Sequence, residues 1–207
     1  SLQIVDGPNT KFRCFSASQE VLFKAVYNLR KRNFDTLRAM QTSAEMAAAI
    51  SSAIPKNAGI IRLHVGGDFF NPNYFLAWLQ VVESRPDILF YAYTKSLPFW
   101  ISNMEKVRSL PNFVLTASYG GRHDSLIREH GLRASIVVFS EMEAQNANLP
   151  IDHDDSHAAV PSLRNENFAL MLHGIQPKGS EAGEALKVLK RDKVKHSYSP
   201  KRKKVKV

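Results

Sequence analysis

Cysteine is almost absent from this chain, since Cys14 is the only one among 207 residues. A single cysteine cannot build an internal disulfide framework, which excludes the disulfide-rich secreted class and favours a reducing compartment. No apolar run approaches the roughly 18 residues that span a membrane, and no secretory signal opens the chain. We therefore expect a cytoplasmic protein without a membrane partner.

Several catalytic motifs are missing as well. The chain has no Gly-rich phosphate loop ending in Lys-Ser/Thr, no Gly pattern of a dinucleotide-binding fold and no Ser-centred nucleophile elbow. Residues 152–157 are rich in Asp and His, but their spacing matches no zinc or calcium loop. We interpret this segment as a solvated acidic loop and not as a metal site.

Positive charge is abundant, and it is concentrated at one end. The net charge is +9, and residues 187–207 hold ten Lys or Arg against one Asp, so residues 1–186 sum to zero. Repulsion among these charges predicts a disordered basic tail over residues 190–207. Such a tail binds phosphates non-specifically. The expected nucleic-acid contacts are Lys201, Arg202, Lys203 and Lys204.

The length and the apolar content fit one domain. A hydrophobic content of 44%, with twelve Phe, six Tyr and two Trp, is enough for a substantial core. Because the chain begins with Ser1 and not with Met, we expect residues 1–11 to be a loop that is truncated upstream. A single α/β domain is predicted over residues 12–189, followed by the basic tail.

Apolar periodicity predicts alternating strands and helices. Strands are expected at 12–15, 60–65, 88–93, 113–118, 134–139 and 168–173. Helices are expected at 19–40, 43–54, 72–83, 98–108, 141–147 and 180–189, and a further short helix is expected to end at residue 129. An irregular segment is expected at 148–166. This order is typical of an α/β fold whose mostly parallel sheet of about six strands has crossover helices. Because about six strands are too few for an eight-stranded barrel, we predict an open partial (β/α)6-type barrel or a doubly wound sheet.

The sharpest local signal is the turn that follows the second predicted strand. The strand ends in Gly66-Gly67-Asp68, and Asn71 and Pro72 then suit the first positions of a helix. Ligands of parallel α/β folds bind at the carboxyl ends of strands. Asp68 is therefore a candidate to accept a hydrogen bond from an amine or hydroxyl, or to act as a base.

Polar residues recur directly after the other predicted strands, and a parallel sheet would bring them to one edge. Lys95 and Arg122 are suited to bind a phosphate or carboxylate. His64 is interpreted as a core histidine, and Tyr91 and Tyr93 as packing against a helix more than stacking on a base. The full candidate set at the edge is Ser16, Ser18, Gly67, Asp68, Thr94, Lys95, Ser96, Ser118, Tyr119, Arg122, His123, Ser140, Glu141, His173 and Gly174.

Four sequence runs resemble the bacteriophage "gene product eighty-eight" family, namely Lys11–Ser18, Arg62–Phe69, Phe90–Ser96 and Leu172–Pro177. The resemblance covers most of residues 10–190 and implies the cytoplasm of an infected bacterial host. Members of that family carry further cysteines upstream, in a Cys-Pro-x-Ala-x-x-Cys arrangement that suggests a metal or iron–sulfur site. Only Cys14 is present in this chain.

A looser resemblance points to radical S-adenosylmethionine enzymes, which use a six-unit partial barrel. In those enzymes a Gly-Gly-Glu segment after the second strand binds the methionine amine. The resemblance implies that Gly66, Gly67 and Asp68 bind S-adenosylmethionine and that Cys14 is one ligand of an iron–sulfur cluster. A cluster needs three cysteines, so two would have to come from upstream of this chain.

The leading hypothesis is an enzyme-like protein of this type that acts on a nucleotide or nucleic acid. Asp68 and His173 are then the catalytic candidates, and the expected substrate-binding residues are Lys95, Arg122 and His123. One alternative is a non-catalytic nucleic-acid-binding protein that uses the basic tail. Another is a metal-free hydrolase or transferase in which Asp68 is the nucleophile or base. The sequence does not predict an oligomeric state.

Overall fold

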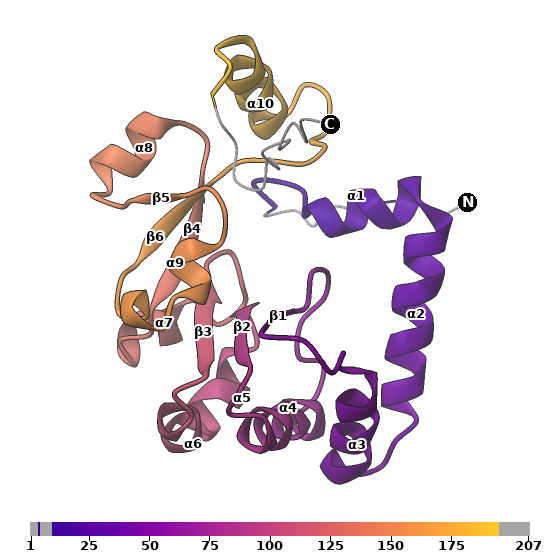
Figure 1. The fold of residues 1–207 in the computed structure, drawn as a ribbon. Coiled ribbons are helices and arrows are strands. Elements are labelled where there is room, and N and C mark those ends of the chain that lie inside the picture. The colour runs from indigo at the N-terminus through magenta and orange to yellow at the C-terminus, as the bar shows by residue number, and fades with distance from the viewer. Residues whose placement is uncertain (1–3, 5–9, 195–207) are drawn as a thin grey trace, which may run out of the picture.

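The computed structural model describes residue 4 and residues 10–194. Its centre is a single parallel sheet with the strand order β1-β2-β3-β4-β6-β5. The sheet curves into an open half-barrel, with helices packed around it (Figure 1). The strands are β1 (Ile60–Leu63), β2 (Leu89–Thr94), β3 (Phe113–Ser118), β4 (Ala134–Val138), β5 (Ile151–Asp152) and β6 (Phe168–Met171). This confirms the predicted α/β fold with a parallel sheet.

Helices separate most of these strands along the chain. Three of them precede β1, and a short 3₁₀ turn, η1, precedes β6. Within residues 10–194, no helix is long and apolar enough to cross a membrane. The helical elements are α1 (Phe15–Leu22), α2 (Lys24–Arg38), α3 (Ser43–Ala53), α4 (Pro72–Ser84), α5 (Leu97–Ser102), α6 (Met104–Ser109), α7 (Ser125–Glu129), α8 (Glu141–Asn146), α9 (Ser156–Ala159), η1 (Pro161–Leu163) and α10 (Glu181–Arg191).

The two faces of the sheet have different covers. Alternate strand residues such as Phe90 and Phe113, at most 2% exposed, pack with α3 to α6 in the largest apolar cluster. On the opposite face Tyr91 and Phe168 pack against α9. Because side chains of a strand alternate between faces, the residues with odd numbers in β2 face α9. Tyr91 and Tyr93 therefore lie against a helix, as the sequence indicated.

Local signals place the helix that follows β1. The Asn71 Oδ1 accepts a hydrogen bond from the Tyr74 amide at 2.7 Å, and Pro72 occupies the first turn. Both features are favoured at a helix N-terminus. The helix then buries Phe75, Ala77 and Val82 almost completely. The predicted segment of strand, turn and helix is thus confirmed, with the strand ending at Leu63.

The predicted strand over residues 12–15 is wrong. Cys14 is the N-cap of α1, and the preceding residues are held by side-chain hydrogen bonds to a loop instead of by a sheet ladder. The predicted helix over residues 19–40 is also interrupted, because Phe23 is extended (φ −123°, ψ 92°) and separates α1 from α2. The helix predicted over residues 98–108 is divided at Asn103, whose backbone (φ −125°, ψ 22°) is neither helical nor extended.

The segment 148–166, which was predicted to be irregular, contains three regular elements: β5, α9 and η1. The two-residue β5 pairs with β6 at the edge of the sheet and so replaces the strand that was wrongly expected near Cys14. These elements are too short for periodicity to reveal. One consequence concerns the Gly-Gly-Asp turn, which follows the first strand of the described sheet and not the second.

Candidate functional site

Asp68 ties the turn after β1 to the end of β2. Its Oδ1 accepts hydrogen bonds from the Phe69 amide at 2.8 Å and the Thr94 hydroxyl at 2.7 Å, and its Oδ2 accepts one from the Lys95 amide at 2.6 Å. A carboxylate has about four lone-pair sites, so roughly one remains for a ligand. The arrangement holds an anionic oxygen at the carboxyl edge of the sheet.

Lys95 extends this connection to β3. Its ammonium donates hydrogen bonds to the carbonyls of Ser118, at 3.1 Å, and Tyr119. Although Lys95 is exposed overall, desolvation of the ammonium lowers its pKa, an effect that Asp124, Asp68 and Cys14 oppose. Cys14 and Lys95 are therefore close enough to interact electrostatically. The loops that follow β1, β2 and β3 are thereby joined into one polar rim.

Helix α1 packs directly on the Gly-Gly turn. A Cβ at Gly66 would lie 2.2 Å from the Ser16 hydroxyl and 2.6 Å from the Arg30 guanidinium carbon. Arg30 donates to the Ser16 hydroxyl at 2.7 Å and forms an ion pair with Glu20 at 3.1 Å. Only a glycine leaves room for this contact at residue 66. The turn and the first two helices consequently share one packed junction.

The loop after β6 holds the segment around Cys14 from the other side. The Gln176 side chain makes two hydrogen bonds with the backbone of Arg13. Its Oε1 accepts from the Arg13 N–H at 2.7 Å, and its Nε2 donates to the Arg13 carbonyl at 3.1 Å. The ring of Phe15 lies 5.4 Å from that of His173. The His173 Nδ1 is 3.1 Å from the Met171 carbonyl. Cys14, which is exposed, is thus fixed between the β1 and β6 loops.

A pocket of about 460 Å³ opens between α1, α2 and the turn after β1. Phe70 stacks on Tyr74 with centroids 4.6 Å apart, and Phe34 meets Phe70 edge-on at 5.0 Å, so one wall is aromatic. The rest of the lining is mostly polar and carries both signs of charge. It includes Glu20, Tyr27, Arg30, Lys31, Asn33, His64, Gly66, Gly67 and Asp68.

His64 lies in the same pocket in an unusual backbone conformation, with φ 55°. Its Nε2 is 3.0 Å from the Tyr74 hydroxyl, and its Nδ1 is buried without a hydrogen-bond partner among the described residues. Desolvation by burial lowers the pKa of His64 to about 4, against a smaller opposing effect of Asp68. The imidazole is therefore neutral near pH 7. Strained backbone of this kind is enriched at ligand sites.

The other candidates lie elsewhere on the edge or beyond the described residues. Arg122 and His123 are exposed in the loop after β3, and within residues 10–194 neither side chain makes a hydrogen bond or ion pair. His173 is near Cys14 and not in the pocket. The predicted nucleic-acid contacts Lys201, Arg202, Lys203 and Lys204 lie outside the described residues.

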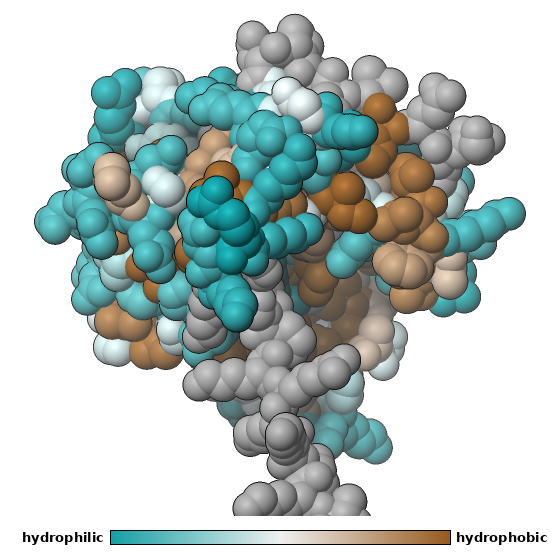
Figure 2. All heavy atoms as spheres, turned by 90° about the horizontal axis from the view of Figure 1, so that it is seen from above, coloured by the Kyte–Doolittle hydropathy of each residue, from teal (hydrophilic) through white to brown (hydrophobic). Residues whose placement is uncertain are grey.

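Seen from above, the face near the carboxyl edge is chemically divided (Figure 2). Apolar side chains gather on the side where Figure 1 places α1 and the start of α2, and polar ones dominate the opposite side. The apolar group includes Val21, Leu22, Phe23 and Leu29, which are between 40% and 58% exposed. Other residues of the same two helices line the pocket.

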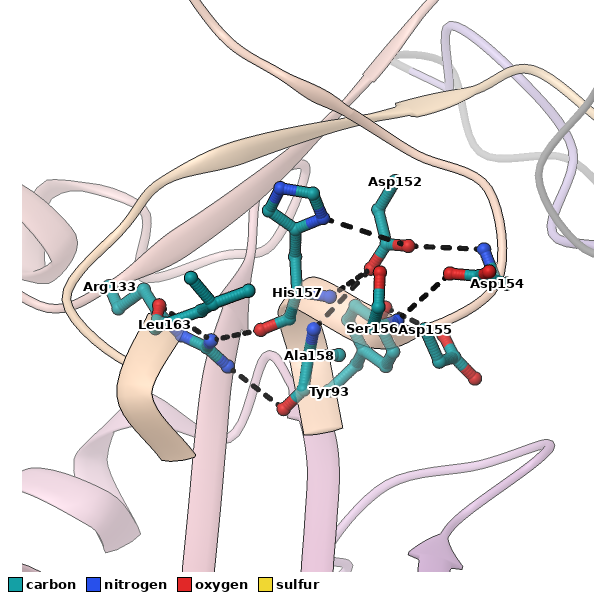
Figure 3. A network of polar contacts seen from close by, with 9 residues as sticks. All are labelled: Tyr93, Arg133, Asp152, Asp154, Asp155, Ser156, His157, Ala158 and Leu163. Carbon is teal, nitrogen blue, oxygen red and sulfur yellow. Dashed lines mark hydrogen bonds and ion pairs between the residues drawn. The ribbon is translucent and has the colours of Figure 1, made fainter. Parts of the chain in front are cut away.

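Asp152 and Asp155 are buried, so the interpretation of residues 152–157 as a solvated acidic loop is wrong for these two carboxylates. Asp152 is 1% exposed and accepts hydrogen bonds from the amides of Asp154, His157 and Ala158 at 3.1 to 3.3 Å (Figure 3). The acidic side chains therefore organise their own loop and the start of α9. No group of three or more His, Cys, Asp or Glu within residues 10–194 is arranged to hold a metal ion.

Asp155 joins this loop to the sheet face. Its carboxylate accepts hydrogen bonds from Arg62 at 2.8 Å, Tyr91 at 3.0 Å and Tyr93 at 2.8 Å. Arg133 secures the other side through the carbonyl of His157 at 2.7 Å. Burial, with the charge on Asp155, raises the pKa of Tyr91. The network therefore joins the start of α9 to β1 and β2.

Sequence reasoning missed two residues that build the rim, Arg30 and Gln176, whereas Ser16 was predicted among the polar residues at this edge. Gln176 belonged to the Leu172–Pro177 run that carried the family resemblance, and that run was its only signal. Arg30 carried none, because a charged residue on an amphipathic helix is ordinarily solvated. The hydrogen bonds of Asp155 were missed because residues 152–157 were expected to form a solvated loop.

A sequence profile described as Gene product 88 matches residues 9–193, which is most of the chain. The chain belongs to the Gene product 88 family. The Gene 88 proteins of Mycobacterium phages L5 and D29 are 31% and 32% identical to it over 90 residues. Each alignment covers 40% of the chain and 38% of the phage protein, so the matched part is well under two thirds of either relative. No solved structure matches the chain significantly.

The runs that carry the Gene product 88 resemblance are far apart in sequence but meet at one edge. Residues 11–18 contact the β6 loop through Gln176 and the β1 turn through Ser16. The β1 turn contacts the end of β2 through Asp68. The resemblance and the geometry thus single out the same part of the molecule.

Proposed function

We propose that the pocket beside the Gly-Gly-Asp turn binds an adenosine derivative that carries an amino acid group, with S-adenosylmethionine as the first candidate. The observation that supports this proposal is the composition of the lining. An aromatic wall of Phe34, Phe70 and Tyr74 stands beside Arg30 and two carboxylates. The volume of about 460 Å³ lies in the range of small-molecule sites.

Each part of such a ligand has a matching group. The aromatic wall suits the face of a purine ring, which stacks favourably on aromatic side chains. Glu20 or the free lone pair of Asp68 accepts from the ligand amine, and Arg30 donates to the ligand carboxylate. Neutral His64 also lines the pocket and adds no charge to it. This pairing uses both signs of charge in the pocket.

The rest of the rim is assigned to a nucleotide or nucleic-acid substrate in an enzyme of this type. Lys95, Arg122 and His123 supply positive or hydrogen-bonding groups beside the loop after β3. His173 is the proposed proton-transfer residue. Its ring lies beside that of Phe15, the residue that follows Cys14 in the chain. Asp68 then positions the turn and the ligand amine instead of attacking a substrate.

An iron–sulfur cluster does not fit the donor set of this chain. Such clusters are held by cysteine thiolates, and Cys14 is the only cysteine in the sequence. The groups around Cys14 are Lys95, Phe15 and the Arg13 backbone, which add no further thiolate. We therefore derive no catalytic step through a cluster, and the proposal rests on the pocket alone.

Isothermal titration calorimetry with S-adenosylmethionine tests the proposal. The wild-type chain should bind it, and Arg30→Gln should weaken binding about tenfold to a hundredfold, because a charge-assisted hydrogen bond contributes roughly 1.5–3 kcal/mol. The matched control is Arg32→Gln, an exposed arginine on the same helix that does not line the pocket. Absence of binding to the wild type, or equal binding by Arg30→Gln, would reject the ligand.

Two further functions are weighed against this one. A nucleic-acid-binding role for the basic tail predicts that removal of residues 195–207, which leaves α10 intact, flattens the dependence of affinity on salt. Each lost phosphate contact changes the log–log slope by about 0.9 on duplex DNA. A hydrolase or transferase that uses Asp68 as nucleophile or base has less support, because three donors already occupy that carboxylate.

A further inference from the structure

A second cavity of about 460 Å³ lies on a different part of the fold, between α6, α7 and the turn after η1. Four arginines line it: Arg108 from α6, Arg128 from α7, Arg133 before β4 and Arg164 after η1. His130 also belongs to the lining. No Asp or Glu among the described residues belongs to the lining.

The positive charge of this arginine groove is not neutralised by ion pairs. Elsewhere Arg30, Arg62 and Arg85 each lie within 3.1 Å of a carboxylate oxygen. Within residues 10–194, no ion pair joins any of the four groove arginines to a carboxylate. Since residues 1–186 have no net charge, the groove is a local excess created by the fold.

Two of the arginines are close enough to disfavour each other's charge. Arg133 is 7% exposed, and its Nε is buried without a hydrogen-bond partner in the described part of the chain. Burial is the main reason that the pKa of Arg133 is lowered to about 10; the like charge of Arg164 adds to this shift, whereas Tyr93 and Asp152 oppose it. Arg164 donates to the Pro111 carbonyl at 2.7 Å, a neutral acceptor. An anion in the groove would relieve this repulsion.

The rest of the lining defines what kind of anion fits. Between the arginines the lining is mostly apolar, with the half-buried ring of Tyr119 beside the buried rings of Trp100 and Phe113, and Asn165 and Asn167 add polar groups. The arginines come from four separate elements and do not share one helix N-terminus or Gly-rich loop, as a single phosphate site ordinarily does. Cations spread along a groove with aromatic side chains are typical of single-stranded nucleic-acid binding.

We infer that the arginine groove binds a single strand of nucleic acid, with phosphates on Arg108, Arg128 and Arg164 and bases against the apolar floor. This site is independent of the pocket beside the Gly-Gly-Asp turn and of the basic tail. Arg108 and Arg128 are exposed, so they reach a ligand without rearrangement of the core. Arg133, held by Thr116 and the carbonyl of His157, provides a fixed charge behind them.

Fluorescence anisotropy of a labelled oligothymidylate, measured over a range of salt concentrations, tests the inference on the full-length chain. The double variant Arg108→Gln/Arg128→Gln should reduce the log–log salt slope by about 1.4, since each phosphate contact to a single strand contributes roughly 0.7. The matched control is Arg32→Gln/Lys56→Gln, which removes the same charge from exposed residues outside the groove. Its slope should equal that of the wild type.

The contribution of the tail is common to all of these proteins and cancels in the comparison. Equal slopes for the wild type and Arg108→Gln/Arg128→Gln would overturn the inference. Binding of free ATP that depends on Arg108 and Arg128, without groove-dependent binding of the strand, would overturn the strand as the ligand. Urea unfolding of both double variants checks that each remains folded, which is expected because all four substituted residues are exposed.

Discussion

At residue 66 the absence of a side chain allows α1 to reach the turn after β1. The Ser16 hydroxyl and the Arg30 guanidinium occupy the space that a Cβ would need. By contrast, Gly59 has no heavy atom within 4 Å of an added Cβ. The two glycines therefore differ in what they do, although both stand close to β1.

Substitution of each glycine by alanine tests this difference. Gly66→Ala should destabilise the protein by about 1–3 kcal/mol, because overpacking of a tight contact forces neighbours to move. Gly59→Ala should change the free energy of unfolding by less than about 1 kcal/mol. Urea unfolding of both variants measures the difference, and similar stability of the two would show that α1 is not packed on the turn.

His64 gives the site a pH-dependent component. Its pKa is lowered to about 4 in the folded state, from 6.5, so the unfolded chain binds more protons between these values. The free energy of unfolding should therefore rise with pH across that window, by at most about 1.4 kcal/mol per pH unit from this group, and level off above it. Stability from this group is complete above pH 6.5 and is lost as the pH falls through 4.

The variant His64→Asn isolates that contribution. Asn tolerates the left-handed backbone conformation but does not titrate. Between pH 4 and 6.5, the stability of the variant should depend less steeply on pH than that of the wild type. Urea unfolding at several pH values measures both slopes. Parallel slopes would contradict the assignment of a neutral, desolvated His64.

Among the elements, α9 and its preceding loop determine how the half-barrel is filled. Asp155 connects them to β1 and β2 through Arg62, Tyr91 and Tyr93. The Arg62–Asp155 ion pair is largely buried, with side chains 19% and 11% exposed. Removal of one partner from a buried pair is costly because the other charge loses its compensation.

Asp155→Asn should therefore destabilise the protein by about 2 to 3 kcal/mol, somewhat below the range for fully buried pairs. Asn keeps the volume and the left-handed conformation of residue 155. Asp87→Asn is the control, because the Arg85–Asp87 pair is solvated and its loss should change stability much less. Thermal or urea unfolding compares them, and equal losses would show that the network does not hold α9.

The elements that periodicity predicted are those whose packing is repeated along their length. The apolar strands over residues 113–118 and 134–138 and the capped helix after Asn71 follow directly from local patterns. The segment near Cys14 failed because its apolar residues pack on loops and not in a sheet. The break at Phe23 has no Gly or Pro signal, so only tertiary contacts of α1 reveal it.

The same distinction applies to the candidate site. Gly66, Gly67 and Asp68 were predicted from a strand–turn–helix pattern, which is local in sequence. Arg30 and Gln176 act over 14 and 163 residues of chain separation, respectively. Unless the order of the strands in the sheet is known, no sequence pattern predicts that such distant residues are in contact. The buried role of Asp152 and Asp155 was missed for the opposite reason, since acidic side chains are rarely buried.

At the scale of the molecule, two of the cavities lined by described residues differ in their charge. The pocket beside the Gly-Gly-Asp turn contains both carboxylates and cations, whereas the arginine groove contains cations alone. This difference favours a zwitterionic small molecule in the first and a polyanion in the second. The profile match to residues 9–193 establishes that the chain belongs to the Gene product 88 family. The two cavities lead to a hypothesis about which ligands this member binds.

Hydrogen exchange of the full-length chain, with and without saturating S-adenosylmethionine, tests the central claim most directly. The account predicts slower exchange in two segments that line the pocket, the middle of α2 and residues 64–74, with little change around the arginine groove. Unchanged exchange in both segments at a ligand concentration that saturates binding, or protection confined to other parts of the chain, would contradict it.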